Sequence, residues 1–215
     1  KAFFLFHKKA TRHFFTVYEE FEKIIQIVVA KGLKKRYNYN WIKFEFYINN
    51  NTESGGLQMS NSAKLSARER IESLVDANSF VEIGGMITKR NTDFNMQEKA
   101  VPADGVITGY GVVNSNLVYI YSQDVTALNG SVGEMHAKKI AGIYEMAMKA
   151  GAPVIGLIDC AGIRVQEAMD ALAGFGDIYM AKVNASGVIP QISAVLGSCG
   201  GGVAISSKLG DITII

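Results

Sequence analysis

The chain has 215 residues, of which 48% are hydrophobic, so it can bury the core of one domain or little more. Its formal net charge of +2 is too small to indicate a polyanionic partner such as nucleic acid, and no uninterrupted apolar run is long enough to span a membrane. The two cysteines, Cys160 and Cys199, form neither a disulfide framework nor a spaced metal site. We therefore expect a reduced, cytoplasmic setting and no metal.

Composition changes abruptly near residue 58. All 8 methionines and all 3 prolines occur at or after Met59, whereas residues 1–58 are rich in phenylalanine and carry an excess of positive charge. We expect an atypical N-terminal segment over 1–58 and a separate domain over 59–215. One hypothesis is that residues 54–56 are translated from a ribosome-binding sequence and that Met59 is the natural start. A disordered tail and a family-specific extension are the alternatives.

The domain opens with signals for a helix and then a strand. Ser66 and Glu69 form the pattern of a capping box, which predicts a helix that begins there and ends near Asp76. Residues 79–83 have the composition of a short strand, and residues 84–103 are polar and irregular, as in a surface loop.

A hairpin and a long helix follow. Residues 105–113 and 117–121 are rich in β-forming side chains and flank a three-residue polar turn, Asn114–Asn116. From Glu134 to about Lys149 the apolar residues recur at helical spacing, and Gly151 can cap the helix. Strands and helices then alternate, which predicts an α/β layered domain. Neither a dinucleotide fingerprint nor a Walker-type phosphate loop is present.

Two strand-to-turn-to-helix units occupy residues 151–202, and each turn is built from small residues. The first turn contains Cys160, Ala161 and Gly162, and the second contains Cys199 followed by glycines 200 to 202. Small residues let a ligand approach the backbone, and a helix start leaves N–H groups without partners. Two such turns side by side would have the geometry of an oxyanion hole. From spacing alone, the simpler interpretation is that the glycines only permit tight turns.

Several separated runs resemble biotin-dependent carboxyltransferase subunits. These are the subunits of propionyl-CoA and related acyl-CoA carboxylases and of methylmalonyl-CoA and glutaconyl-CoA decarboxylases. The runs that carry the resemblance are residues 64–71, 79–82, 109–111 with 118–124, 130–131 with 136–140, 151–156, 159–167 and 185–192. The likeness covers about residues 60–215 and implies a crotonase-like spiral of strand-strand-helix units. It also implies a truncated chain, because members have a second, similar domain that would mediate homo-oligomer formation.

The resemblance implies a reaction. A carboxyl group would move between biotin, held by a biotin carboxyl carrier protein, and the carbon next to a CoA thioester, and decarboxylated biotin would take the substrate proton. The thioester passes through an enolate, whose oxygen backbone N–H groups can stabilise. We assign this role to the N–H groups around Ala161 and Gly162 and around Gly200 and Gly201. Ala161 stands where many members have glycine, so its methyl group would narrow the acyl pocket.

The resemblance also suggests residues that contact CoA. Asn129, Gly130 and Ser131 are predicted to lie along the CoA, although a plain loop fits the sequence equally well. Arg164 is predicted either to bind a phosphate of CoA or to form a salt bridge with Glu167 or Asp170.

Other polar residues are expected to be structural. His136 lies in a predicted helix, where a packing or surface position is favoured over catalysis. The two cysteines are expected to be buried small thiols rather than nucleophiles, since neither has a nearby signal for an activating histidine.

Three other functions remain open from the sequence. The same site can work in the decarboxylase direction, in which case contact with a membrane would be indirect, through a decarboxylase pump. A crotonase-like hydratase or isomerase is disfavoured, because Ser206, Ser207 and Lys208 follow the second turn where hydratases typically need glutamates. A non-catalytic acyl-CoA-binding fragment is the third alternative, and the fragment is expected to be inactive alone.

Overall fold

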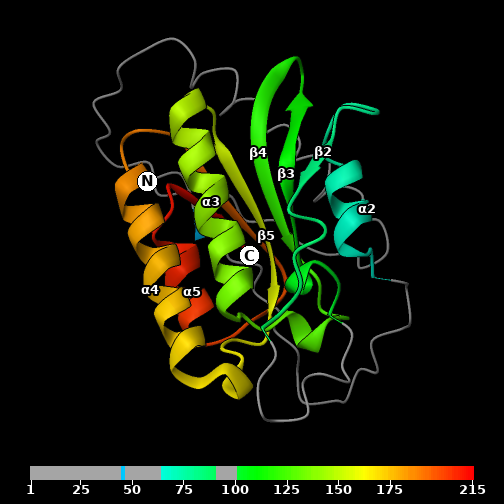
Figure 1. Ribbon diagram of the computed structural model, residues 1–215. Helices are drawn as coiled ribbons and strands as arrows, with labels where there is room; N and C mark the ends of the chain where they lie inside the picture. Colours follow the sequence, from blue (N-terminus) through cyan, green and yellow to red (C-terminus); the bar gives the residue numbers. More distant parts are fainter. Residues whose placement is uncertain (1–44, 47–63, 91–100) are drawn as a thin grey trace, which may run out of the picture.

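The protein forms one seven-stranded mixed sheet with helices on both faces (Figure 1). The computed structural model describes residues 45–46, 64–90 and 101–215, so the predictions for most of the N-terminal segment lie outside it. The strands are β1 (Glu45–Phe46), β2 (Val81–Ile83), β3 (Val106–Val113), β4 (Asn116–Gln123), β5 (Val154–Cys160), β6 (Gln191–Cys199) and β7 (Ile212–Ile214). The helices are α2 (Ala67–Glu72), α3 (Glu134–Ala150), α4 (Ala168–Ala185) and α5 (Gly202–Lys208).

The sheet order is β1-β7-β6-β5-β4-β3-β2. Strands β2, β3 and β4 run antiparallel, and the pairs from β4 to β7 run parallel, with α3, α4 and α5 in the connections. Parallel neighbours need such crossover connections, so the predicted alternation of strands and helices is confirmed. The C-terminal ends of β5 and β6 therefore meet at the same edge of the sheet, which is where both small-residue turns begin.

The local predictions for α2 and α3 are confirmed. Ser66 caps α2, since its Oγ accepts the N–H of Glu69 at 3.3 Å and its own N–H donates to Glu69 Oε2 at 2.8 Å. Helix α3 ends at Gly151, which adopts a left-handed backbone with φ 67° and ψ 24°.

The hairpin prediction is correct in place but wrong in the length of its turn. Val113 pairs directly with Asn116, so only Asn114 and Ser115 form the turn, and both have positive φ values of 48° and 64°. A two-residue turn with this backbone matches the twist of the flanking strands better than the three-residue turn expected.

The sheet separates two apolar clusters. On one face α3, α4 and α5 cover the sheet, and residues such as Ile143, Tyr144 and Phe175 pack there with Ile158 of β5. On the other face α2 packs Ile71 and Leu74 against the alternate residues of β4, β5 and β6. Strand β5 is buried along its whole length, so it forms the centre of the molecule and holds the first turn rigidly. Among residues 64–90 and 101–215, no helix has the length and apolar character needed to cross a bilayer.

Candidate functional site

The two small-residue turns lie directly against each other. We call residues 160–163 the first turn and residues 199–202 the second turn. Cys160 and Cys199 are paired across β5 and β6, and the N–H of Gly200 donates to the carbonyl of Cys160 at 3.0 Å. A Cβ on Gly200 would overlap the carbonyl oxygen of Ala161, and one on Gly162 would lie 3.5 Å from the carbonyl oxygen of Gly200. The close approach that two converging amides require is therefore present.

Hydrogen bonding within the protein decides which amides remain available. The N–H of Ala161 donates to the carbonyl of Asn129 at 3.0 Å, and the N–H of Gly200 is bound to Cys160 as described. The N–H of Gly162 has only a sulfur acceptor, Cys160 Sγ, at 3.3 Å, which is a weak partner. The N–H of Gly201 donates to none of the described residues. Of the four predicted residues, Gly162 and Gly201 therefore have N–H groups with no oxygen acceptor among the described residues, and the oxyanion role itself stays a prediction.

Both of these glycines adopt backbones that other residues rarely take. Gly162 has a φ of 123°, and Gly201 has a φ of 53° with a ψ of −124°. A side chain at either position would be strained, so glycine is required for the turn conformation itself. Gly201 is exposed and Gly162 is buried, so the two N–H groups differ in how readily solvent reaches them.

The structure contradicts the predicted contact between Arg164 and a CoA phosphate. The Arg164 side chain is 0% exposed, and its Nη1 pairs with Glu167 Oε1 at 2.8 Å and with Asp104 Oδ1. Its Nη2 donates to the carbonyl of Ser131 at 2.8 Å. The salt bridge to Glu167 is confirmed, whereas Asp170 pairs with Arg90 instead. Arg164 is thus a structural cation beneath the first turn, where two carboxylates satisfy it.

The segment Asn129–Ser131 supports the first turn from below. The carbonyl of Asn129 accepts the Ala161 N–H, and a Cβ on Gly130 would overlap the carbonyl oxygen of Asp159. Ser131 is buried against Arg164. Asn129 is exposed. Contact of this segment with CoA stays a prediction, and the structure adds a packing role that the sequence did not reveal.

His136 is a packing residue, as expected. It is buried; its Nδ1 lies 2.9 Å from the carbonyl of Asp104, and its Nε2 lies 3.2 Å from the Gln123 amide nitrogen. The carbonyl can only accept and the amide nitrogen can only donate, so Nδ1 carries the proton. Burial, together with Arg164 nearby, lowers the pKa of His136 to about 3, so the ring is neutral at physiological pH.

The two thiols differ in their surroundings, and that of Cys160 is unsuited to nucleophilic catalysis. Cys160 is buried, and burial raises the pKa of its thiol to about 11, so it is protonated at neutral pH. Cys199 is only partly buried, and its Sγ lies 3.7 Å from Ser207 Oγ. The expectation of a buried thiol is thus confirmed for Cys160 and holds only in part for Cys199.

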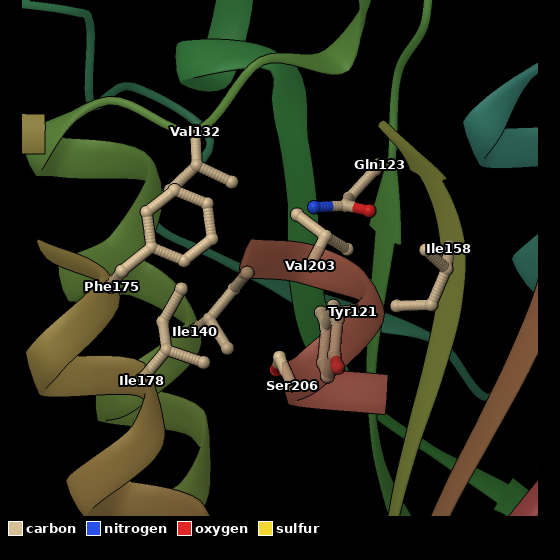
Figure 2. A pocket seen from close by; sticks show the side chains of 9 residues that line it. All are labelled: Tyr121, Gln123, Val132, Ile140, Ile158, Phe175, Ile178, Val203 and Ser206. Carbon is tan, nitrogen blue, oxygen red and sulfur yellow. The ribbon is translucent and has the colours of Figure 1, made fainter. Parts of the chain in front are cut away.

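The space behind the turns is almost completely filled. Figure 2 shows Phe175 and Ile178 on α4, with the Phe175 ring next to Val132, and Tyr121 and Ile158 on the strands. These side chains line a cavity of about 10 Å³. That volume holds at most about one water molecule. Ala161 and Gly201, by contrast, are exposed.

A match to a known family decides the class of the protein. The family model described as the carboxyl transferase domain matches residues 58–215. The chain belongs to the carboxyl transferase family. Membership agrees with the resemblance stated from the sequence motifs, whereas the division of the chain near residue 58 stays a prediction.

Characterised carboxyl transferases share about half of the aligned residues with this chain. The propionyl-CoA carboxylase beta chain of Roseobacter denitrificans is 51% identical over 148 residues, which is 69% of this chain and 29% of that protein. The alpha subunit of methylmalonyl-CoA decarboxylase from Veillonella parvula is 50% identical over 148 residues, which is again 69% of this chain and 29% of that protein. The human mitochondrial propionyl-CoA carboxylase beta chain is 48% identical over 154 residues. The chain thus spans less than a third of the length of these relatives.

Solved structures of carboxyl transferases confirm the crotonase-like fold. Transcarboxylase 12S, crystallised as a hexamer with methylmalonyl-CoA and methylmalonic acid bound, superposes with a TM-score of 0.70 at 32% identity. The match covers 97% of this chain and 36% of that one. A Pseudomonas malonate decarboxylase in complex with malonate superposes with a TM-score of 0.63 at 28% identity, over 69% of this chain and 57% of that one.

Sequence reasoning missed several polar residues around the turns of this carboxyl transferase domain. Asp159 binds Arg70 and Lys64, and Asp104 binds Arg164. Asp159 stands inside a run that carried the family resemblance, so its position in the motif was a usable signal. Asp104 follows an irregular polar stretch, and nothing in the sequence distinguished it from a solvated loop residue.

Proposed function

We propose that the chain supplies the acyl-CoA half of a carboxyltransferase site. In this proposal a carboxyl group moves between biotin on a carrier protein and the α carbon of an acyl-CoA, through a thioester enolate. The observation that supports the proposal most directly is the contact of the two turns, which places Gly162 and Gly201 in adjoining turns at the C-terminal ends of β5 and β6. Membership of the carboxyl transferase family supports the reaction class.

The main contribution of these residues would be electrostatic. As the bond at the α carbon changes, negative charge grows on the thioester oxygen, and fixed N–H donors stabilise that charge more than the ground state. Losing one such donor costs roughly 3–4 kcal/mol in comparable enzymes. Gly162 is held in the first turn and Gly201 in the second turn. Their N–H groups therefore need no reorganisation when negative charge develops on the thioester oxygen.

Neither turn supplies a proton acceptor of its own. The Cys160 thiol is protonated and the Arg164 guanidinium is paired, so among the described residues of the turns no side chain serves as general base. The cavity behind the turns is also too small for a biotin ring. We therefore propose that these residues hold and polarise the thioester, and that the biotin side of the site comes from elsewhere in the assembly.

The direction of transfer stays open within the proposal. Relatives named as a carboxylase and as a decarboxylase are 51% and 50% identical to this chain, so identity favours neither. The enolate is common to both directions, and the same donors would serve each. The hydratase alternative has less support, because Ser206 and Ser207 of α5 are buried and no acidic side chain stands there.

The outer face of α4 supports an oligomer. Four large apolar side chains recur there at helical spacing, and each is more than half exposed: Met169, Leu172, Met180 and Val183. An apolar helix face of this kind normally packs against another surface. We propose that a second copy of the subunit covers it, in keeping with the hexamer of the transcarboxylase 12S relative.

The test is an assay of the complete gene product. Incubation with malonyl-CoA or methylmalonyl-CoA and free biotin should yield carboxybiotin and the shortened acyl-CoA in equal amounts. Acyl-CoA binding without transfer would overturn the proposal and favour a binding module. Hydration of an enoyl-CoA without biotin would favour the hydratase alternative.

A further inference from the structure

The pairing of β5 with β6 slips just before the two turns. Ile158 pairs with Val195, and the next pair is Cys160 with Cys199, so two steps along β5 span four steps along β6. The extra residues of β6 form a bulge, which interrupts the regular ladder of backbone hydrogen bonds. The N–H of Ser198, inside this bulge, needs another acceptor.

The Asp159 side chain supplies that acceptor. Its Oδ1 accepts the Ser198 N–H at 3.0 Å. Two residues later, the Gly200 N–H donates to the carbonyl of Cys160 at 3.0 Å. Two adjacent residues of β5 therefore bind Ser198 at the end of β6 and Gly200 just after it, one through a side chain and one through the backbone. Tyr179 Oη also donates to the carbonyl of Gly202 at 2.8 Å, so the Asp159 contact is one of several that fix the second turn.

Gly197 makes room for this contact. A Cβ at residue 197 would overlap both Asp159 Oδ1 and Lys64 Nζ. The carboxylate and the ammonium thus occupy the volume where a side chain of the bulge would otherwise lie. The absence of a side chain here is consequently a requirement of the Asp159 contact, independent of the glycines that form the turns.

Two cations hold the carboxylate in place. Asp159 Oδ2 accepts Arg70 Nη2 at 2.8 Å and Lys64 Nζ at 2.7 Å, and the Asp159 side chain is 0% exposed. Burial alone would raise the pKa of this carboxyl, but the hydrogen bonds from Lys64 and Arg70 outweigh it, so its pKa is lowered. The carboxylate is charged at neutral pH and is a strong acceptor for the Ser198 N–H.

We propose that Asp159 is a positioning residue for the oxyanion site: by holding the β6 bulge, it fixes the position of the second turn, and with it the N–H of Gly201, against the first turn. This inference rests on the proposed carboxyl transfer and adds a residue to it. Asp159 lies on the α2 face of the sheet and does not touch the substrate. Its effect on the reaction passes entirely through the backbone of β6.

The test uses three variants of the complete gene product. Asp159→Asn keeps the shape and one acceptor oxygen but removes the charge, and Gly197→Ala displaces the carboxylate sterically. Both should lower kcat about 10- to 100-fold, because misplacing a reacting group by about 1 Å costs on the order of 100-fold. KM for the acyl-CoA should change less than about threefold, since binding of the CoA does not depend on the enolate.

Leu157→Ala is the matched control. Leu157 is buried on the same strand and the same face, two residues before Asp159. The Leu157→Ala variant should lower the melting temperature at least as much as Asp159→Asn does. Measured below the melting temperature of the variant, its kcat should stay within about twofold of wild type. Lys64→Met, which removes the half-exposed partner, covers the case in which Asp159→Asn fails to fold, and it should lower kcat by a smaller factor of about 3 to 10.

A binding measurement separates this inference from the proposed function. A CoA thioether that carries a nitronate bears the charge of an enolate. The wild-type protein should bind this compound more tightly than it binds CoA. The Asp159→Asn variant should lose most of that preference. If Asp159→Asn and Gly197→Ala both kept the kcat of wild type and its preference for the nitronate, the positioning role of Asp159 would be overturned and the proposed function would stand. A wild-type protein that neither transfers a carboxyl group nor prefers the nitronate would overturn the proposed function and this inference with it.

Discussion

The carbonyl oxygen of Ala161 occupies the place where residue 200 would carry a side chain. A Cβ on Gly200 would overlap it, and because a backbone carbonyl cannot rotate away like a flexible side chain, the two turns would have to separate. We predict that Gly200→Ala lowers kcat for carboxyl transfer about 100-fold, the scale found when one oxyanion donor is lost or misplaced. Gly176→Ala on α4, where a Cβ meets no atom within 4 Å, should leave kcat unchanged. Equal rates for both variants would show that close contact of the turns is not needed.

Arg164 should matter for stability more than for substrate binding. Its guanidinium is buried between Asp104 and Glu167, so Arg164→Met would leave two buried carboxylates without their cation. We expect a loss of about 3–5 kcal/mol in the free energy of unfolding, measured by urea denaturation. Arg90→Met removes exposed ion pairs with Glu134 and Asp170 and should change stability little. If Arg164→Met instead raised KM for acyl-CoA at unchanged stability, the guanidinium would have to reach the ligand.

Lys182 gives the fold a pH dependence of its own. The side chain is buried under the Tyr144 ring, its Nζ hydrogen-bonds Ser193 Oγ at 3.3 Å, and burial lowers its pKa to about 8 despite the opposing charge of Asp211. A lysine whose folded pKa is lowered destabilises the fold below about pH 8, and this cost is relieved as the pH rises toward the unfolded pKa. Wild type should therefore gain roughly 1–3 kcal/mol relative to Lys182→Met between pH 7 and pH 10. Urea unfolding of both proteins across this range measures the difference, and a constant difference would contradict the prediction.

Ala161 should limit the size of the acyl group. It is exposed at the outer side of the turns, and its N–H is bound to Asn129, so Ala161→Gly removes the methyl group without freeing the amide. We predict that this variant raises kcat/KM for a longer acyl-CoA up to about 10-fold and leaves the shortest substrate nearly unchanged. A uniform change for all chain lengths would mean that the methyl group does not border the acyl chain.

The outer face of α4 should hold the subunits together. Met180→Lys places a charge in the centre of that face and should shift the oligomer toward smaller species in analytical ultracentrifugation. Met86→Lys is the control, because Met86 is 96% exposed and is not part of α4. An unchanged sedimentation profile for Met180→Lys would show that a second copy does not cover this surface.

The sequence predicted the parts of the fold that depend on local signals. The capping box at Ser66, the helix end at Gly151 and the positions of the β3–β4 hairpin strands each follow from a short pattern, and each is confirmed. The hairpin turn differs by one residue because positive φ values at Asn114 and Ser115 shorten it, and that choice depends on strand twist.

The site was predicted less completely, because its details depend on contacts that are distant in sequence. The family motif identified both turns, but spacing does not reveal that the Ala161 N–H is bound to Asn129. The burial of Arg164 was equally hidden, since its partner Asp104 is 60 residues away. Local patterns state which residues form a turn, whereas the tertiary structure determines which of their N–H groups remain unbound.

The ion pair between Arg70 and Asp159 has a consequence for how the polypeptide matures. Helix α2 leaves the ribosome before β5, and the carboxylate that neutralises its buried arginine is synthesised 89 residues later. Until β5 emerges, docking of α2 would bury an uncompensated cation, so the nascent helix is expected to stay hydrated. Docking of α2 and ordering of the β6 bulge are then expected to occur together, after β5 has been synthesised.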